Sequence, residues 1–256
     1  PAMTLEAWQK EMSGRQIGYN GEEISICHKL SWDQVIPALP PEAHGGCISA
    51  LDWVGPQTQR FLLNPELLLK EHHEVELPRM PGRVHVEEGD KLRIAQELVK
   101  RGVCRWIPLE SVYRVGTTPV LNGLFGVEKP TKLADGRVIL RCIMNLTGSN
   151  ATQWQLEGGT RSLPNITAWQ SVALSDLEEL TMFQSDMCSA FYLFRLPVCW
   201  LRHLAFNVIF PSCIVGGPEN CEMALACQVL PMGWLSSVSI MQEISEKLLK
   251  IGRAHV

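Results

Sequence analysis

Two apolar runs joined by a short polar turn constrain the fold of this chain more than any other feature. Residues 118–129 (TPVLNGLFGVEK) and 136–146 (GRVILRCIMNL) have the β-branched and apolar composition of strands, and the segment PTKLADG links them. Its Asp135-Gly136 pair is a strong hairpin signal, because glycine readily adopts the positive φ that tight hairpin turns need. The pattern predicts an antiparallel hairpin.

Longer segments on either side of this hairpin also have clear periodicity. Residues 90–102 carry apolar side chains at helical spacing and end in a glycine stop signal, which predicts a helix. Residues 204–210 and 222–231 flank a Gly-Pro turn and predict a second antiparallel pair. Residues 236–250 repeat an apolar side chain every fourth position, as an amphipathic helix does. This order of elements predicts an α+β protein with a mainly antiparallel sheet.

Shorter elements are predicted at three further places. Residues 64–74 start with Asn64 as a plausible N-cap, followed by a proline, and predict a short helix. Ser175 and Glu178 form a capping box that predicts another. Residues 182–186 predict an apolar strand that stops at a carboxylate.

Composition indicates a soluble globular protein. With 256 residues, 46% of them hydrophobic, the chain is long enough for one large domain or two small ones. No run reaches the roughly 20 apolar residues that span a bilayer, and the first residues lack a signal-peptide pattern. The nine cysteines form no CxxC pair and lie in apolar stretches, so we expect reduced core residues of an intracellular, non-secreted protein of the cytoplasm or nucleus.

Charge is uneven along the chain although the net charge is only −4. Residues 1–78 and 146–256 are acidic, whereas residues 79–145 carry 12 basic and 7 acidic side chains. A basic middle segment fits a polyanionic partner better than a small neutral ligand, although ordinary solvated lysines and arginines would give the same count.

Asp186 poses the sharpest chemical question in the sequence. It ends an apolar run in MFQSDMCSAFYLFRLP, residues 182–197. A carboxylate near a core is costly unless it is paired or coordinated. Either it caps a helix or a turn, or it serves a site.

Four spaced motifs favour the second reading. FGVEKP with GRVILRCIMNLTGSN, then SDMCSAF, then AFNVIF, and then CQVLPMGWLSSVSIMQ resemble the successive fingers and palm motifs of retroelement (retrotransposon) reverse transcriptases, which are RNA-directed DNA polymerases. The resemblance covers about residues 90–246. It implies that residues 86–256 form a partial reverse transcriptase domain, with fingers, an incomplete palm and no thumb. Residues 1–85 would be an irregular N-terminal extension with short helices.

The resemblance assigns a role to Asp186. Such polymerases transfer a nucleotide to a primer 3′-OH with metal ions held by carboxylates, and Asp186 matches the first palm carboxylate, a catalytic ligand for Mg²⁺. The main-chain N–H groups of Met187 and Cys188 would then face the triphosphate. Phe191 matches the aromatic residue that collides with a 2′-hydroxyl and so favours deoxynucleotides. A core phenylalanine is the alternative for Phe191.

Further nucleotide-binding residues follow from the same resemblance. Lys129 and Arg141 match two cations that clamp the triphosphate. Gly233 would let the backbone pass close to the nucleotide or template. Met232 stands where many family members carry glutamine, which replaces a polar side chain by an apolar one.

Other positions depart from the family pattern. Asn145 and Thr147 replace an acidic and a basic residue, which weakens the expected ion-pair and template contacts. The family's second carboxylate motif, Tyr-x-Asp-Asp, follows the Leu-Pro-x-Gly motif, and this sequence contains no Asp-Asp pair. We therefore expect no polymerase activity from the chain as given.

Three hypotheses remain open at this point. The chain is a fragment of a polymerase whose partners are an RNA template, a DNA primer and deoxynucleoside triphosphates. Alternatively it is a non-catalytic module that binds RNA or an RNA–DNA hybrid by charge and shape. An ordinary α+β metabolic domain would have to match the four motifs by accident. No membrane partner is expected, and the sequence does not fix an oligomeric state.

Overall fold

The structure is a computed structural model that describes residues 27–80, 82–156 and 186–253, together with residues 173, 175, 177 and 179. It is a mixed α+β protein with several small, mostly antiparallel sheets, as the sequence predicts at this coarser level. None of the helices in these residues is long and apolar enough to cross a membrane.

The predicted hairpin is confirmed. Strand β5 (Gly123–Lys132) pairs antiparallel with β6 (Val138–Asn145), and the register runs from Gly123↔Asn145 to Glu128↔Leu140. The ladder is irregular between Glu128 and Lys132, where the register shifts. Gly136 in the turn has a φ of 85°, the conformation that the Asp-Gly signal requires.

The second predicted pair is also confirmed and belongs to a larger sheet. Strand β8 (Ala205–Pro211) pairs with β9 (Glu222–Cys227), and β9 pairs on its other side with β2 (Cys104–Pro108). Strand β2 is absent from the predicted elements, because five residues are too few to show a clear alternation of apolar and polar side chains. A short helix, α7 (Ser212–Val215), lies between β8 and β9.

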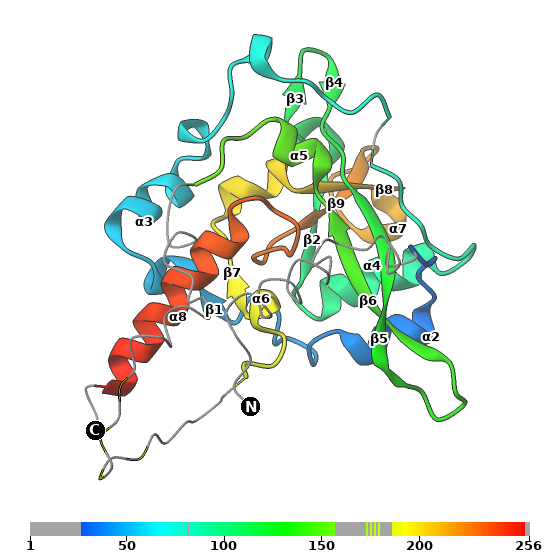
Figure 1. The fold of residues 1–256 in the computed structure, drawn as a ribbon. Helices are drawn as coiled ribbons and strands as arrows, with labels where there is room; N and C mark the ends of the chain where they lie inside the picture. The colour runs from blue at the N-terminus through cyan, green and yellow to red at the C-terminus, as the bar shows by residue number, and fades with distance from the viewer. Residues whose placement is uncertain are drawn as a thin grey trace, which may run out of the picture.

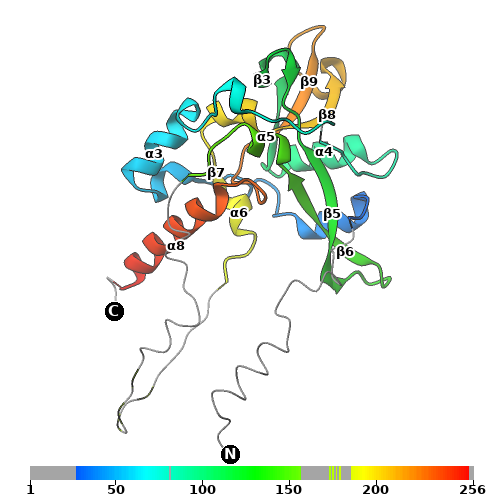
Figure 2. The ribbon, with the colours of Figure 1, turned by 45° about the horizontal axis from the view of Figure 1, so that its top comes forward.

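Both long predicted helices are present. Helix α4 (Lys91–Lys100) ends before Gly102, whose φ is 77°, and α8 (Ser237–Arg253) buries the predicted apolar face through Ile240 and Ile244. In Figures 1 and 2, α8 and the β5–β6 hairpin extend from opposite sides of the body. The short helix α6 (Ala190–Leu193) lies between them in both views.

The remaining elements are short. They are α2 (Trp32–Val35), η1 (Ile36–Ala38), β1 (Ile48–Ser49), η2 (Ala50–Trp53), α3 (Pro56–Leu63), η3 (Pro65–Leu67), η4 (His72–Glu74), η5 (Leu109–Ser111), β3 (Arg114–Val115), β4 (Thr118–Pro119), α5 (Thr147–Ala151), β7 (Phe194–Arg195) and η8 (Val198–His203). β3 pairs antiparallel with β4, and β1 pairs parallel with β7.

The predicted helix over residues 64–74 is wrong. The segment forms only η3 and η4. Between η3 and η4 the backbone forms hydrogen bonds with a distant segment of the chain. The N–H of Lys70 donates to Thr152 O at 2.9 Å, and the N–H of Trp154 donates to Leu68 O at 2.7 Å. These distant hydrogen bonds replace the ones a helix would make along this stretch.

Residues before 86 share the main hydrophobic core. Leu30, Leu39 and Leu62 are buried in the same cluster as Phe206 and Trp234. The division of the chain at residues 85 and 86 stays a prediction. The predicted strand over residues 182–186 and the helix of the Ser175 capping box lie outside the described residues, apart from isolated positions.

The nine cysteines are free thiols, but most are not core residues. Cys104, Cys142 and Cys227 are buried, five others are exposed and Cys221 is intermediate. The expectation of core cysteines is therefore wrong for most of them, because an apolar stretch on a short loop or helix turns part of its residues to the surface.

Asn122 joins the hairpin to the three-stranded sheet. Its side chain is fully buried, and its amide donates to Ser149 Oγ at 2.7 Å and to Ala205 O at 2.8 Å. Its Oδ1 accepts the N–H of Ser149 at 3.1 Å. Its backbone adds two hydrogen bonds, to Ala205 O and from the N–H of Asn207. The hydrogen bonds of Asn122 thus connect the start of β5 to α5 and to β8.

His203 is a buried histidine whose ring has no polar partner among the described residues. It is 2% exposed, neither ring nitrogen has a hydrogen bond there, and the ring lies 4.8 Å from that of Tyr113 and 5.8 Å from that of Trp200. Burial, and secondarily the charge of Arg202, lowers the pKa of His203 to about 4. The folded protein therefore holds this imidazole neutral.

This depressed pKa predicts acid destabilisation. An unfolded histidine titrates near 6.5, so the contribution of His203 to stability is complete above that pH and is lost as the pH falls toward 4. Between pH 7.5 and pH 5 the loss is about 2 kcal/mol. Urea unfolding at both pH values should show a larger loss of unfolding free energy at pH 5 for the wild type than for His203→Phe, whose aromatic ring does not titrate. Equal losses of unfolding free energy in the two proteins would contradict the lowered pKa of His203.

Candidate nucleotide-binding cavity

A cavity of about 510 Å³ lies between the hairpin, α6 and the turn after β9. It is lined by six of the eight residues that the resemblance selects: Lys129, Arg141, Asp186, Cys188, Phe191 and Met232. Met187 and Gly233, the other two, are not among its lining residues. The volume lies within the range of roughly 300–1,000 Å³ typical of small-molecule sites.

The hairpin supplies the two cations. Arg141 is exposed on β6, opposite Val127 of β5. Lys129 lies where the ladder shifts register, and such an irregularity re-aims the side chains it carries. Both side chains reach the same cavity although regular pairing does not place them opposite each other.

A turn before α6 supplies the acidic wall. Asp186 and Cys188 are exposed residues that line the cavity. Ser189 follows in the left-handed conformation with a φ of 55°, which reverses the chain into α6. Strain of this kind in a residue other than glycine, asparagine or aspartate persists only where the surrounding structure enforces it, and it is concentrated at functional sites. The backbone oxygen of Met187 accepts a hydrogen bond from the N–H of Ala190, and Met187 is not among the residues that line the cavity.

Tyr192 fixes the position of α6. Its hydroxyl donates to Cys142 O of β6 at 3.2 Å, and its backbone oxygen accepts the N–H of Gly46. Burial raises the pKa of Tyr192, so the hydroxyl stays protonated and keeps this bond. Phe191 beside it is half-buried, packs against the core and still lines the cavity. The core and site interpretations of Phe191 are therefore compatible.

The turn that carries Met232 packs closely against β6. Gly233 has a φ of 99°, and a Cβ there would lie 2.6 Å from Met144 O. Asn150 holds the turn from α5: its amide donates to Gly233 O at 2.8 Å and its Oδ1 accepts the N–H of Leu235 at 3.1 Å. In this structure Gly233 lets the chain approach a strand of the protein.

Sequence reasoning missed part of the wall. Pro37, Ala38 and Leu39 line the cavity, and the Gln34 side chain ties their segment to Val138 O of β6 at 2.9 Å. They belong to the segment interpreted as an extension, and no local signal marks them. Asn150 was also missed, although an asparagine four residues after the predicted strand is a plausible clamp.

The charged groups of the cavity are not paired within the described residues. The side chains of Lys129, Arg141 and Asp186 form no hydrogen bond or ion pair with any described residue, whereas the Arg137 side chain at the hairpin turn bonds Asp135 at 2.7 Å. The cavity therefore combines two cations and one carboxylate that are available to a ligand.

The cavity offers few oxygen ligands to a divalent cation. Asp186 is the one carboxylate that lines the cavity among the described residues, and these residues hold no cluster of three His, Cys, Asp or Glu side chains. Mg²⁺ commonly binds through one or two carboxylates together with substrate phosphates. Asp186 suits one Mg²⁺ that arrives with a triphosphate, and the described residues do not suit two ions.

A scan against models of protein families gave no match for this chain, and a search among curated proteins found no significant similarity. The assignment of the cavity thus depends on its residues and on their placement.

The close contact at Gly233 gives a testable consequence. Gly233→Ala should lower the free energy of unfolding by about 2–4 kcal/mol, because it adds a clash with a backbone oxygen to the cost of a positive φ. Gly89→Ala is the matched control, since Gly89 has a φ of 93° and open space around it. Urea unfolding of both variants separates the two costs. Equal losses would contradict the tight approach to β6.

Proposed function

We propose that this chain is part of an RNA-directed DNA polymerase of retroelement type and that its cavity binds a deoxynucleoside triphosphate with Mg²⁺. The observation that carries the proposal is the meeting of Lys129, Arg141 and Asp186 around one cavity. Lys129 and Arg141 belong to the hairpin motif, and Asp186 belongs to a separate motif 45 positions after Arg141. Accidental motif matches would not be expected to converge on one ligand-sized space.

Each side chain has a distinct task in this proposal. Arg141 holds phosphate oxygens with its planar fork, and Lys129 adds a point charge. Asp186 would hold Mg²⁺, which neutralises charge that develops on the phosphoryl group during transfer. Phe191 lies under the sugar and excludes a 2′-hydroxyl by contact.

Catalysis needs more than the described residues contain. In-line transfer to a primer 3′-OH by the two-metal route requires carboxylates for both ions. Asp186 alone is insufficient, so we expect the chain to bind nucleotide without extending a primer on an RNA template.

The same shortage of carboxylates favours a second candidate, a non-catalytic module that binds RNA or an RNA–DNA hybrid. Such a module would use the cations of the hairpin for phosphate contacts, and its affinity would fall steeply with salt. It would bind the hybrid equally well with and without Mg²⁺ and deoxynucleotide.

Charge removal at the cavity tests the first candidate. Lys129→Gln and Arg141→Gln should each weaken binding of Mg²⁺-dATP by roughly tenfold, because each removes a charge-assisted phosphate contact. Calorimetric titration of the full chain gives the affinities. Lys132→Gln, an exposed lysine at the hairpin tip outside the cavity lining, makes the same charge change and should have little effect.

Two outcomes would contradict the proposal. If Arg141→Gln bound Mg²⁺-dATP as tightly as the wild type, the cavity would not hold the triphosphate. If the wild type did not bind Mg²⁺-dATP, whereas hybrid affinity depended on Lys129 and Arg141, the non-catalytic module would be the better assignment.

Sugar selection provides an independent test. Phe191→Ala should reduce the preference for Mg²⁺-dATP over Mg²⁺-ATP, because the ring no longer occupies the space of the 2′-hydroxyl. The ratio of the two dissociation constants is the measurement, and circular dichroism controls for lost folding. An unchanged ratio in a folded variant would assign Phe191 to the core alone.

A further inference from the structure

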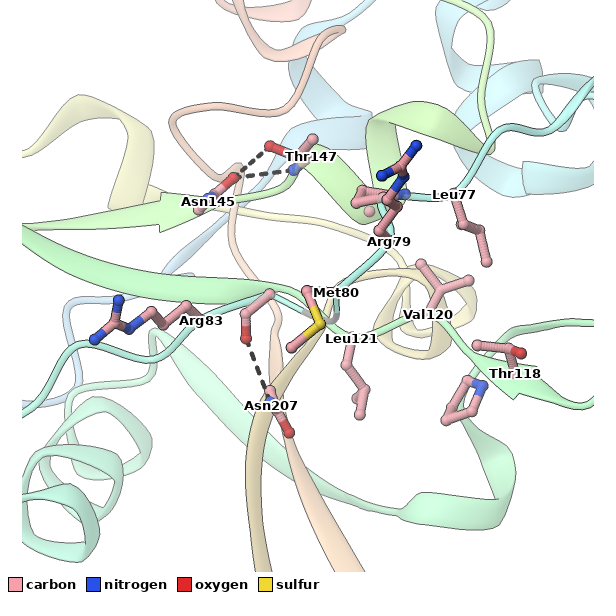
Figure 3. A pocket seen from close by; sticks show the side chains of 14 residues that line it. Leu77, Arg79, Met80, Arg83, Thr118, Val120, Leu121, Asn145, Thr147 and Asn207 are labelled. Carbon is pink, nitrogen blue, oxygen red and sulfur yellow. Dashed lines mark hydrogen bonds between the residues drawn. The ribbon is translucent and has the colours of Figure 1, made fainter.

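The cavity at the base of the hairpin belongs with the function proposed above and is not a separate site. It has a volume of about 400 Å³, and Arg79, Arg83, Asn145 and Thr147 are among the residues that line it (Figure 3). Positions 145 and 147 are those for which the resemblance already implies template contacts. The three-stranded sheet, by contrast, contains a pair of buried thiols that the proposed function does not use.

Cys104 and Cys227 face each other across two neighbouring strands (Figure 1). Cys104 is the first residue of β2 and is paired with Cys227, the last residue of β9. Both side chains are buried. The Cys104 thiol is hydrogen-bonded to the Cys227 thiol, and the Cys227 thiol donates to Val229 O at 3.3 Å. The two sulfur atoms are thus already neighbours in the reduced protein.

The hydrogen bonds around this pair show which kind of cross-strand position it occupies. The N–H of Gln228 donates to Val103 O at 3.1 Å, so the next pair along the ladder is a hydrogen-bonded one. The N–H of Cys227 points away from β2 and donates to Leu204 O at 3.0 Å. Since the two kinds of pair alternate in an antiparallel ladder, Cys104 and Cys227 form a non-hydrogen-bonded pair. The Cα atoms of such a pair are about 4.5 Å apart, which lies within the range of roughly 4.4–6.8 Å that a disulfide bridges.

The described residues contain a third buried thiol, Cys142 of β6. Strand β6 belongs to a different sheet from β2 and β9, so no ladder aligns its Cβ with that of Cys104 or Cys227. Burial raises the pKa of Cys142 to about 12, and its thiol stays protonated at neutral pH. The backbone therefore selects one pair among the three buried thiols.

We propose that Cys104 and Cys227 are an oxidation site, at which hydrogen peroxide converts the facing thiols into a reversible cross-strand disulfide. One thiol attacks a peroxide oxygen, the O–O bond breaks and water leaves, which gives a sulfenic acid. The second thiol attacks this sulfur, so that the S–S bond forms, the S–O bond breaks and a second water molecule leaves. Each sulfur is oxidised by one electron, and the peroxide is reduced to water.

The position of β2 gives a small oxidant a route to the pair. Among the strands of the described residues, β2 pairs with β9 alone, and Cys104 is at its end. The end of an edge strand opens locally more readily than a central strand. Burial raises the pKa of the Cys104 thiol, which stays protonated while the strand is paired and becomes reactive when it opens. Oxidation of the pair should therefore be slower than that of the exposed thiols.

Peptide mapping of the full chain tests the cross-link. The folded protein is treated with hydrogen peroxide, the remaining thiols are blocked with N-ethylmaleimide in denaturant, and tryptic peptides are identified by mass spectrometry. Trypsin releases Cys104 in the peptide of residues 102–105 and Cys227 in that of residues 203–247. We expect these two peptides to be joined with the loss of two hydrogen atoms, and dithiothreitol should separate them.

Matched variants identify the partner, because the peptide of residues 203–247 also contains Cys213 and Cys221. Cys227→Ala should abolish the link, whereas Cys213→Ala and Cys221→Ala should keep it. The disulfide closes a loop of more than a hundred residues, so the urea midpoint of the oxidised protein should exceed that of the reduced protein by roughly 1–2 M. Cys104→Ala should show no such rise.

Three outcomes would overturn the proposal. The peptide of residues 102–105 could stay unlinked while the exposed thiols are oxidised. It could instead be joined to the peptide of residues 142–161, which carries Cys142. The link could also persist in Cys227→Ala. Since no nucleotide enters these measurements, their result is independent of the polymerase proposal.

Discussion

The buried amide of Asn122 is the interaction on which the rest of the structure depends. It connects the start of the hairpin to α5 and to the central sheet through three side-chain hydrogen bonds. A fully buried amide that lost these partners would have a large desolvation cost, so the three elements form one unit. The cavity lined by Lys129 and Arg141 is built on the hairpin of that unit. Its geometry therefore depends on a buried contact of Asn122, which is not among its lining residues.

Elements with strong local signals could be predicted from the sequence. The hairpin has its turn chemistry, α4 has a glycine stop, and α8 has an unbroken apolar stripe. Each of these signals lies within the element it predicts. The helix predicted over residues 64–74 failed because its backbone bonds to residues 152–154, which no local pattern reveals. Strand β2 was missed for a related reason, since its pairing with β9 spans more than a hundred residues.

For the candidate site, the charged residues could be predicted from the sequence, but part of the wall could not. The resemblance to reverse transcriptase motifs selected Lys129, Arg141 and Asp186, and these three residues line one cavity. The opposite wall, from residues 37–39, could not be predicted, because it reaches the site only through packing of a distant segment. Gly233 shows a further limit: the need for glycine was predicted, but the close neighbour is the oxygen of Met144. A glycine in a motif marks a position where a side chain is not tolerated, but the sequence does not show which neighbour excludes it.

The register shift in the hairpin separates the tip from the body. Between Glu128 and Lys132 the ladder is interrupted, whereas the pairs from Glu128 back to Gly123 are in continuous register. A change in the length of the turn beyond Lys132 is therefore absorbed at the irregular stretch before it reaches the regular pairs that orient Arg141. The tip is the natural place for an inserted label or affinity tag, because the strand pairing below it would keep its alignment.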